Sequence, residues 1–365
     1  MIPGPTPLSA AVRAALAEPV RNHVSAEHAA TMGRIQEGLR ACVGSPQARV
    51  HAVSGSGTLA MEMALVNHVR PGERIVVCSH GFFGDRFAEI AATLGIEATV
   101  VAAEWGEHVD PGRLGEACAA GPPPVLVTIT HVDTSTGVLA DVPALVAAAR
   151  DSGALAVLDA VCAAGGVTEE MEAWGIDIVL TGAQKALGLP PGLALLAVSE
   201  RARERREQIG PIAAFYADLH RWDPVVEEPA HAYFSTPPTS LLRALEVSLD
   251  EIAAEGLPQR FERHRRNAEW LRSGMAELGL QPLTAAECLA PTLSALRVPA
   301  QVDEAQLRAE IAREGVVVAG CLGRFAGRGI RIGHMGSAGA AEVERTLNAA
   351  AAALQRLHPR VTSSA

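Results

Sequence analysis

One repeating pattern constrains the fold of this chain more than any other feature. From Arg49 to Val198, short apolar runs alternate with glycine turns and with longer segments whose apolar residues recur every three or four positions. The short runs predict buried strands and the longer segments predict helices, an alternation typical of a mostly parallel sheet covered on both faces. We expect strands at Val50–Val53, Ile75–Cys78, Ala98–Val101, Val125–Ile129, Ala154–Leu158, Ile176–Leu180 and Leu193–Val198. The predicted fold is therefore α/β, with a seven-stranded sheet sandwiched by helices, and the short turn before the last strand predicts one antiparallel member.

The sequence on either side of this pattern predicts the remaining parts of the molecule. The proline-rich start Ile2–Leu8 predicts an extended arm, and Asp223–Pro238 is expected to be a loop. We divide the chain into an N-terminal arm (residues 1–22), a large domain (residues 23–254) and a smaller α+β C-terminal domain (residues 255–365). In the smaller domain we expect strands at Leu293–Val298, Val316–Ala319 and Ile330–Ile332 and helices at Glu304–Glu314 and Ala340–Leu357. The tail from Val361 is expected to fray.

Charge and cysteine content narrow the classes of partner and the compartment. The formal net charge is −10 without a long basic run, which argues against nucleic acid or an anionic membrane as the main partner. No apolar run approaches the ~20 residues that a membrane helix needs. The six cysteines include no Cys-x-x-Cys pair, and the start lacks the features of a secretory signal. We therefore expect a cytoplasmic protein that acts on small molecules, and we assign no metal site.

A single lysine is the strongest chemical signal in the chain. Lysine and arginine together number 31, and Lys185 is the only lysine. Arginine stays protonated, whereas a buried lysine amine can lose its proton and attack a carbonyl, so the two residues are not interchangeable where a nucleophilic nitrogen is required. We interpret Lys185 as a lysine that forms a Schiff base. The alternative is the chance survival of one lysine in an arginine-rich sequence.

The turn Ser54–Thr58 lies between a predicted strand and a predicted helix and can bind an anion. Its backbone N–H groups and hydroxyls stand at a helix N-terminus, where the helix dipole favours negative charge, so a phosphate fits there. The same segment matches a dinucleotide-binding fingerprint, but the next strand ends in Cys78-Ser79-His80 without the required acidic residue. The lysine of a phosphate-binding P-loop is also missing. A glycine-serine turn that only caps the helix remains an alternative.

Four further features lie at the ends of predicted strands or within them. Asp159 ends a buried strand, where a carboxylate needs a cation or a protonated ring nitrogen as its partner, although it could instead cap a turn. The polar segment Thr130–Gly137 follows another strand, and some of its groups are expected to be loop caps. Phe83 can stack on a flat ligand or belong to the core. Arg331, between two isoleucines, can bind a carboxylate through its fork or form a structural ion pair.

Together these residues are what a pyridoxal phosphate enzyme acting on amino acids requires. The chain resembles the class V aminotransferases of fold type I, specifically the alanine–glyoxylate and serine–pyruvate (serine–glyoxylate) group. The resemblance covers nearly the whole chain and is carried by Pro3-Gly4-Pro5, Ser54–Thr58, Gly81–Arg86, Ser135-Thr136-Gly137, Asp159–Gly166, Gly182–Gly192 and Arg331–Gly336.

The resemblance implies roles at the matching positions. Lys185 would form the Schiff base and move a proton, and Asp159 would pair with the pyridinium nitrogen. The other cofactor-binding residues would be Ser56, Gly57, Thr58 and Gln184 at the phosphate, Phe83 on the ring, Thr134 at the phenolic oxygen, and Val161. Tyr233 and Thr236 would reach the phosphate from a neighbouring subunit, which implies a homodimer. Arg331 would bind the substrate α-carboxylate, and the backbone at Gly4 would close the pocket.

The resemblance predicts transfer of an amino group from alanine or serine to a 2-oxo acid such as glyoxylate or pyruvate. Cys162 stands where relatives often carry serine, and Asn22 disturbs the stretch that lines the substrate entrance, so the donor stays open. The first alternative is elimination by a β-lyase or desulfurase, for which Cys321 is the only plausible mobile cysteine. The second is a cofactor-binding scaffold without turnover, which intact Lys185, Asp159 and Arg331 disfavour.

Overall fold

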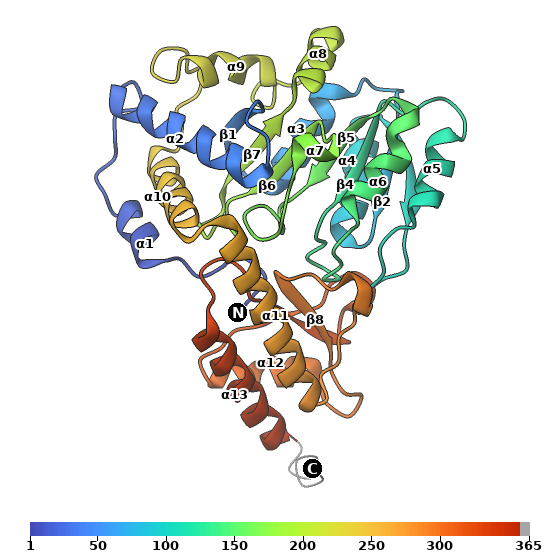
Figure 1. Ribbon diagram of the computed structural model, residues 1–365, viewed down its shortest axis with the longest axis vertical. Coiled ribbons are helices and arrows are strands. Elements are labelled where there is room, and N and C mark those ends of the chain that lie inside the picture. The colour runs from blue at the N-terminus through green and yellow to red at the C-terminus, as the bar shows by residue number, and fades with distance from the viewer. Residues whose placement is uncertain (358–365) are drawn as a thin grey trace.

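The computed structural model describes residues 1–357 and shows a three-layered upper part and a smaller lower part. The predicted tail from Val361 lies outside the described residues. In Figure 1 a central sheet is covered by helices on both faces, and the smaller part lies below it around β8, α12 and α13. No helix within residues 1–357 has the length and apolar character needed to cross a lipid bilayer.

The central sheet has seven strands in the order β1-β7-β6-β5-β4-β2-β3. Strand β7 runs antiparallel to β1 and β6, and the other neighbouring strands are parallel. The predicted α/β sheet with one antiparallel member is therefore confirmed. The bounds are β1 (Arg49–Gly55), β2 (Arg74–Ser79), β3 (Glu97–Ala102), β4 (Leu126–Thr130), β5 (Leu155–Asp159), β6 (Ile178–Gly182) and β7 (Gly192–Val198).

The helices cover the sheet because alternate strand residues point to opposite faces. In β2, Val76 and Cys78 join the core beneath α2, α5, α6 and α10, whereas Ile75 and Val77 join the core beneath α3, α4, α8 and α9. The helices are α1 (Ala10–Leu16), α2 (Ala26–Val43), α3 (Gly57–His68), α4 (Phe82–Thr93), α5 (Pro111–Ala119), α6 (Val142–Ala149), α7 (Met171–Trp174), α8 (Glu200–Ile209), α9 (Leu219–Glu227) and α10 (Thr239–Glu255).

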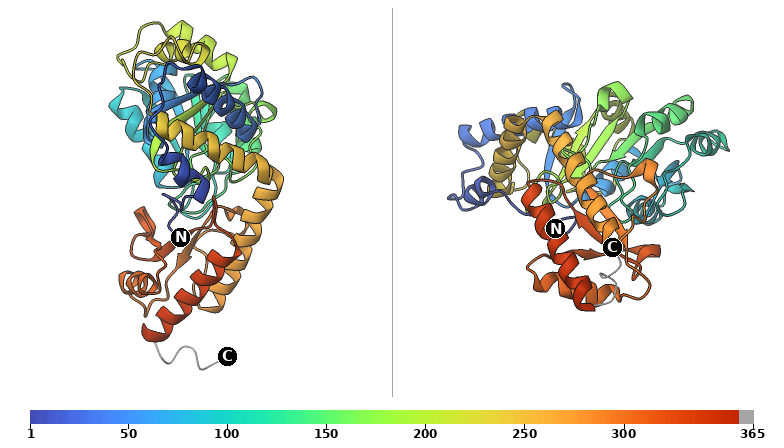
Figure 2. Two further views of the ribbon diagram at one scale, coloured as in Figure 1. Left: turned by 90° about the vertical axis from the view of Figure 1, so that its left-hand side faces the viewer. Right: turned by 60° about the horizontal axis from the view of Figure 1, so that its bottom comes forward.

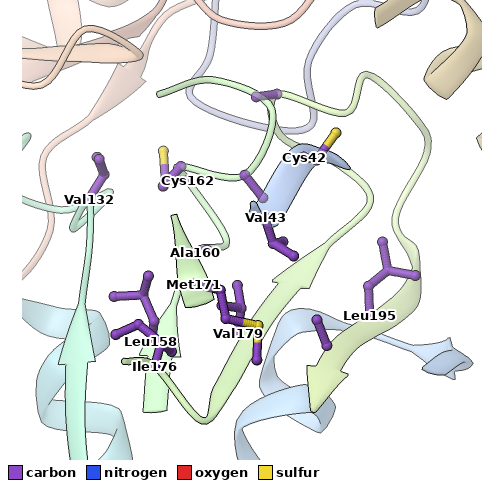
Figure 3. Packing of buried hydrophobic residues seen from close by; sticks show 14 of the residues in the cluster. Cys42, Val43, Val132, Leu158, Ala160, Cys162, Met171, Ile176, Val179 and Leu195 are labelled. Atoms are coloured by element: carbon purple, nitrogen blue, oxygen red, sulfur yellow. The ribbon is translucent and has the colours of Figure 1, made fainter. Parts of the chain in front are cut away.

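Close packing across the strands fixes the middle of the sheet. Leu158 of β5 is in register with Val179 of β6, and both pack with Met171 and Ile176 in one buried cluster (Figure 3). Burying a side chain of this size contributes about 1.5–3 kcal/mol. The strand ends that follow these residues, Asp159 and Gly182, are thereby held in fixed positions at the carboxyl edge of the sheet.

The lower part has its own antiparallel sheet and core. Its strand order is β8-β10-β9, with β8 (Leu293–Arg297), β9 (Ala319–Gly320) and β10 (Gly329–Gly333). Its helices are α11 (Leu257–Glu277), α12 (Glu304–Arg313) and α13 (Ala340–Leu357). Between α10 and α11 lies Gly256, with a left-handed φ of 82°, next to the residue 254/255 boundary that we propose between the two domains.

One predicted loop was partly wrong. Helix α9 runs into the segment Asp223–Pro238, which we expected to be a loop because of its prolines. Asp218 caps the helix through the backbone N–H of His220, and buried Trp222 and Val225 pack beneath it. The stabilisation from burying these side chains exceeds the cost of the backbone hydrogen bond that is missing at Pro224, which has no N–H to donate.

The predicted strand Val316–Ala319 was also wrong in extent. Only Ala319 and Gly320 pair with β10, although Val316 and Val318 are buried and Val317 is 59% exposed, as a strand pattern predicts. The backbone carbonyl of Val317 instead accepts a hydrogen bond from the terminal amine of Met1, at 2.9 Å. The chain terminus therefore occupies this segment's hydrogen-bonding edge.

The predicted extended arm lies between the two parts. The N-terminus is at their junction in both views of Figure 2. The backbone N–H of Thr6 donates to Gln184 O at 3.1 Å, and its hydroxyl donates to Lys185 O at 2.8 Å. The backbone N–H of Gly333 donates to Met1 O at 2.9 Å. The arm is thus hydrogen-bonded both to the turn that carries the lysine and to β10.

Candidate active site

A cavity of about 290 Å³ lies at the carboxyl edge of the central sheet. The loops that follow β1, β2, β4, β5 and β6 meet there, because the carboxyl ends of parallel strands share one edge. It is lined by ten of the predicted site residues, namely Gly4, Ser56, Gly57, Thr58, Phe83, Thr134, Asp159, Val161, Gln184 and Lys185. Sequence analysis missed Pro5, Met61, Arg86, Val132 and Pro191, which line it as well.

Lys185 is buried in the turn between β6 and β7. Its Nζ donates a hydrogen bond to the backbone carbonyl of Pro3 in the arm. Burial lowers the pKa of the Lys185 amine, and the nearby positive charge of Arg331 lowers it further. A larger share of the amine is therefore unprotonated and nucleophilic than for a lysine in water.

The arm touches Lys185 through a glycine. Gly4 has a φ of 98°, in the region that favours glycine, and a Cβ atom built there would lie 2.6 Å from Lys185 Cδ and 2.9 Å from Nζ. Only a residue without a side chain leaves room for the lysine in its present position. The predicted closing of the pocket by the backbone at Gly4 fits this geometry.

Asp159 is buried at the end of β5. Its Oδ1 accepts a hydrogen bond of 2.9 Å from the backbone N–H of Val161, the only hydrogen bond to this carboxylate from a described residue. Burial, together with the neighbouring carboxylate of Asp133, raises the pKa of Asp159 to about 7. A cation placed against this carboxylate would favour its ionised form.

The N-terminus of α3 lines the cavity. Ser56 is the N-cap residue, but its hydroxyl makes no capping hydrogen bond, so the first N–H groups of the helix have no side-chain partner. Gly57 lets this backbone pass close to the next loop, since a Cβ there would lie 2.8 Å from Val161 Cγ2. Nearby, Gln184 Oε1 is buried without a hydrogen-bond partner among the described residues.

Phe83 and Arg86 form one wall of the cavity. The side chain of Asp133 accepts hydrogen bonds from the backbone N–H groups of Phe83 (3.0 Å) and Gly84 (3.3 Å), which fixes the start of α4. The Arg86 guanidinium lies 4.9 Å from the Phe83 ring centroid, and its Nη1 donates to Thr58 Oγ1 at 3.2 Å. The spacing of three residues in a helix was the signal that could have revealed this pair.

Arg331 lies in β10, behind the cavity wall. It is buried, and its Nε and Nη1 donate to the backbone carbonyls of Gly320 and Thr134, each at 2.9 Å. No carboxylate forms an ion pair with Arg331 within residues 1–357. The structural ion pair considered above is therefore not formed, and Arg331 is connected to the cavity through Thr134.

Tyr233 and Thr236 do not line the cavity of their own chain. Both are exposed, and the Tyr233 ring packs edge-on against His23, with ring centroids 4.3 Å apart. Within one chain the structure thus separates these two residues from the other predicted cofactor-binding residues.

Comparison with known proteins settles the family. Residues 12–326 match the family described as aminotransferase class-V. The chain belongs to that family. This class-V aminotransferase is 35% identical to alanine–glyoxylate aminotransferase 1 of Saccharomyces cerevisiae over 92% of its own length and 91% of the yeast protein. It is 33% identical to the L-aspartate–glyoxylate aminotransferase of Paracoccus denitrificans, covering 92% and 86% of the two chains.

Solved structures agree with this assignment. The alanine–glyoxylate aminotransferase from Nostoc sp. superposes on the class-V aminotransferase with a TM-score of 0.92 at 30% identity, covering 98% of this chain and 94% of the other. The predicted fold type I architecture and the predicted aminotransferase class are confirmed.

Proposed function

We propose that the protein is a pyridoxal phosphate-dependent aminotransferase that moves the amino group of a small amino acid, alanine or serine, to glyoxylate or pyruvate. The observation that carries this proposal is the meeting of Lys185, Asp159 and the uncapped start of α3 in one cavity. The names of the yeast and Paracoccus relatives support glyoxylate as the acceptor, whereas they differ in the amino donor.

The cavity fits the cofactor on three independent counts. The uncapped N–H groups of α3 suit its phosphate, and the unpartnered Gln184 Oε1 suits a hydrogen-bond donor or a bridging water. The Asp159 carboxylate, with a single hydrogen bond, suits a protonated ring nitrogen. The buried Lys185 amine suits an aldehyde. Ser56, Gly57 and Thr58 would hold the phosphate, Phe83 and Val161 the ring, and Thr134 the phenolic oxygen.

When bound, pyridoxal phosphate supplies an electron sink for negative charge that develops at the substrate's α-carbon. Lys185 is the base that would take the α-proton and return it to the carbon that carried the cofactor's aldehyde, since among residues 1–357 it is the only amine that lines the cavity. Asp159 would hold the ring nitrogen protonated, which keeps the sink effective. Burial favours the neutral forms of the Lys185 amine and the Asp159 carboxyl. Next to the positively charged ring nitrogen, the Asp159 carboxyl would be ionised.

Arg331 would bind the substrate's α-carboxylate. A buried guanidinium without a carboxylate partner is costly, and a bidentate carboxylate from a ligand would offset that cost. Because Arg331 also holds the backbone carbonyl of Thr134 at 2.9 Å, the same side chain would set the distance between the carboxylate site and the cofactor wall.

The proposal includes a homodimer with a shared site and a cytoplasmic compartment. Tyr233 and Thr236 lie on the surface, away from their own cavity, so they would serve the partner's phosphate site. The six cysteines are all unpaired, as a reducing compartment favours.

A panel of amino donors tests the function. The cofactor-loaded protein would be mixed with each donor in the absence of an acceptor, and then with glyoxylate or pyruvate, while the visible absorbance of the cofactor is followed. A small donor should convert the cofactor to pyridoxamine phosphate, and glyoxylate should restore the original spectrum. A cycle that instead releases ammonia and a 2-oxo acid without needing an acceptor would contradict the proposal.

Lys185→Ala and Lys185→Arg supply the matched control for this panel. Both should lose the lysine-dependent absorbance, since the chain has no other lysine. In the wild type, borohydride should fix the cofactor on the peptide Thr181–Leu187. Label on any other peptide would refute the assignment of Lys185.

The desulfurase form of the elimination alternative finds no support in the site. Cys321, the cysteine proposed for a desulfurase, is buried and does not line the cavity. Burial raises its pKa to about 12, so it is a thiol and not the nucleophilic thiolate at neutral pH. Its backbone N–H is also hydrogen-bonded to Gly329 O at 3.0 Å, which ties the segment to β10.

A further inference from the structure

Arg86 is a cation of the cavity to which neither the sequence motifs nor the family resemblance gives a role. Among residues 1–357, Arg86 and Lys185 are the two basic residues that line the cavity. Lys185 donates to the arm and is the proposed partner of the cofactor's aldehyde, whereas the Arg86 guanidinium lies beside the start of α3 and donates to Thr58.

The surroundings of Arg86 hold it without neutralising it. Phe82 and Phe83 present ring faces 5.0 and 4.9 Å from its Cζ atom, a cation–π arrangement that restricts the side chain to one direction. Its Nη1 donates to Thr58 Oγ1 at 3.2 Å. No carboxylate forms an ion pair with it in the described part of the chain.

The charge of the anion site requires such a group. A phosphate monoester carries between one and two negative charges at neutral pH. The Ser54–Thr58 turn supplies N–H groups and hydroxyls but contains no basic residue. A guanidinium bonded to Thr58, one of the proposed phosphate ligands, is placed to supply the missing positive charge.

We propose that Arg86 is the charge-bearing phosphate-binding residue of this site, acting on the phosphate ester directly and through Thr58. This inference rests on the proposed function. It assigns to α4 two tasks, because Phe83 would stack on the cofactor ring while Arg86, one helical turn later, would hold the phosphate.

The test compares two ligands that differ only in the phosphate. Apoprotein of the wild type, Arg86→Ala, Arg86→Gln and Arg86→Lys would be titrated with pyridoxal phosphate and with pyridoxal, following the absorbance of the bound ligand. Losing a charge-assisted hydrogen bond should raise the Kd for pyridoxal phosphate about 10- to 100-fold in the alanine and glutamine variants. The Kd for pyridoxal should change less than about twofold, and lysine, which keeps the charge, should restore part of the loss.

Competition and folding controls complete the experiment. Inorganic phosphate should compete with pyridoxal phosphate for the wild type and much less for Arg86→Ala. Arg113→Ala, an exposed arginine on α5, should leave both Kd values unchanged. Circular dichroism of each apoprotein reports folding, and if the alanine variant does not fold, the lysine and glutamine variants give the same comparison.

Three results would overturn the inference. A parallel loss for both ligands would mean that Arg86 only braces the Phe83 ring. Unchanged Kd values would remove it from the site. A change confined to the KM of amino donors with a second carboxylate would make it a substrate-binding residue. Failure of the wild type to bind pyridoxal phosphate would instead refute the proposed function, and this inference with it.

Discussion

At the scale of single residues, the site depends on two buried groups of opposite charge. Burial lowers the pKa of the Lys185 amine and raises the pKa of the Asp159 carboxyl to about 7. Each shift favours the neutral form of its group. A cationic ring placed against Asp159 would favour the ionised carboxylate, and the neutral Lys185 amine is the form that can attack a carbonyl carbon. The same burial makes both groups costly to the protein alone.

The cost of Asp159 predicts a pH dependence of stability in the apoprotein. Its carboxyl has an ordinary pKa of 3.8 in the unfolded chain and about 7 in the folded one. Between these values the folded state keeps a proton that the unfolded state has lost, so the free energy of unfolding falls as the pH rises. For this group the loss from pH 5 to pH 8 is about 2–3 kcal/mol.

Asp159→Asn should remove that dependence. Urea unfolding of both apoproteins at pH 5 and pH 8 measures it, and the asparagine variant should gain on the wild type as the pH rises. A difference between the two proteins that is the same at both pH values would show that Asp159 is ionised throughout. Aminotransferase activity of the variant should be lost at both values, because asparagine cannot hold the ring nitrogen protonated.

A glycine beside Lys185 gives a second prediction at this scale. Gly4→Ala and Gly72→Ala both place a side chain at a left-handed φ, 98° and 82°, which costs about 1–2 kcal/mol of stability. A Cβ at position 72 meets no atom within 4 Å, whereas at position 4 it meets the Lys185 side chain. Because the Lys185 side chain can move, the clash in Gly4→Ala should displace the lysine and should not add to the loss of stability.

Only Gly4→Ala should therefore impair catalysis. Displacing a reacting group by about 1 Å can reduce the rate about 100-fold, so kcat of Gly4→Ala should fall by that order while Gly72→Ala stays near the wild type. Thermal unfolding would show similar losses in both. Equal kcat values would mean that the arm does not set the position of the lysine.

Sequence alone predicts a residue well when its chemistry is unusual for its surroundings. A unique lysine after a buried strand and an aspartate at the end of another needed no contacts to be singled out. Arg86 did not stand out in this way, because it is one of many arginines. Its helical spacing from Phe83 was visible in the sequence, but its contact with Thr58 exists only in the folded chain. The position of Gly4 beside Lys185 likewise exists only after folding.

At the scale of elements, the start of α4 is held from another loop. Asp133 is fully buried, and its carboxylate accepts from the backbone N–H groups of Phe83, Gly84 and Ser135. A negative charge at a helix N-terminus is favourable, and here it also joins the loop that carries Thr134 to the helix that carries Phe83. One side chain thereby fixes two walls of the cavity.

Asp133→Ala should cost more stability than the loss of an ordinary helix cap. It leaves several buried donors without a partner, for which we expect about 2–4 kcal/mol. Asp110 caps α5 at an exposed position by accepting from Arg113 N at 2.9 Å, and Asp110→Ala should cost about 1 kcal/mol. Urea unfolding compares the two, and equal losses would show that Asp133 is only a cap.

The elements themselves were predictable where local pattern and tertiary packing agree. The inner strands β4 and β5 have this agreement, since every residue of each strand is buried. Agreement fails at α9, where Pro224 signals a break but the burial of Trp222 and Val225 maintains the helix. It fails again at Val316–Ala319, where the alternation is strand-like but Met1 takes the place of a neighbouring strand.

At the scale of the whole molecule, two of the predicted cofactor-binding residues do not line the cavity of their own chain. Tyr233 and Thr236 are exposed and lie outside the cavity, so they can contribute only if another copy of the chain supplies them. A closed two-fold dimer would place the same segment of each chain at the other's cavity. Under the proposed homodimer, activity would therefore require both copies of the chain.

Mixed dimers test this sharing directly. One chain would carry Lys185→Ala and the other Tyr233→Phe with Thr236→Ala, each with its own tag, so that only the mixed dimer is purified. If the segment acts in the partner's site, one cavity of the mixed dimer has an intact lysine together with an intact Tyr233 and Thr236, and the other has neither. Activity should then reach about half that of the wild-type dimer, well above either parent homodimer. If the segment serves its own cavity, both sites are damaged, and the mixed dimer should be no more active than the mean of the two parents.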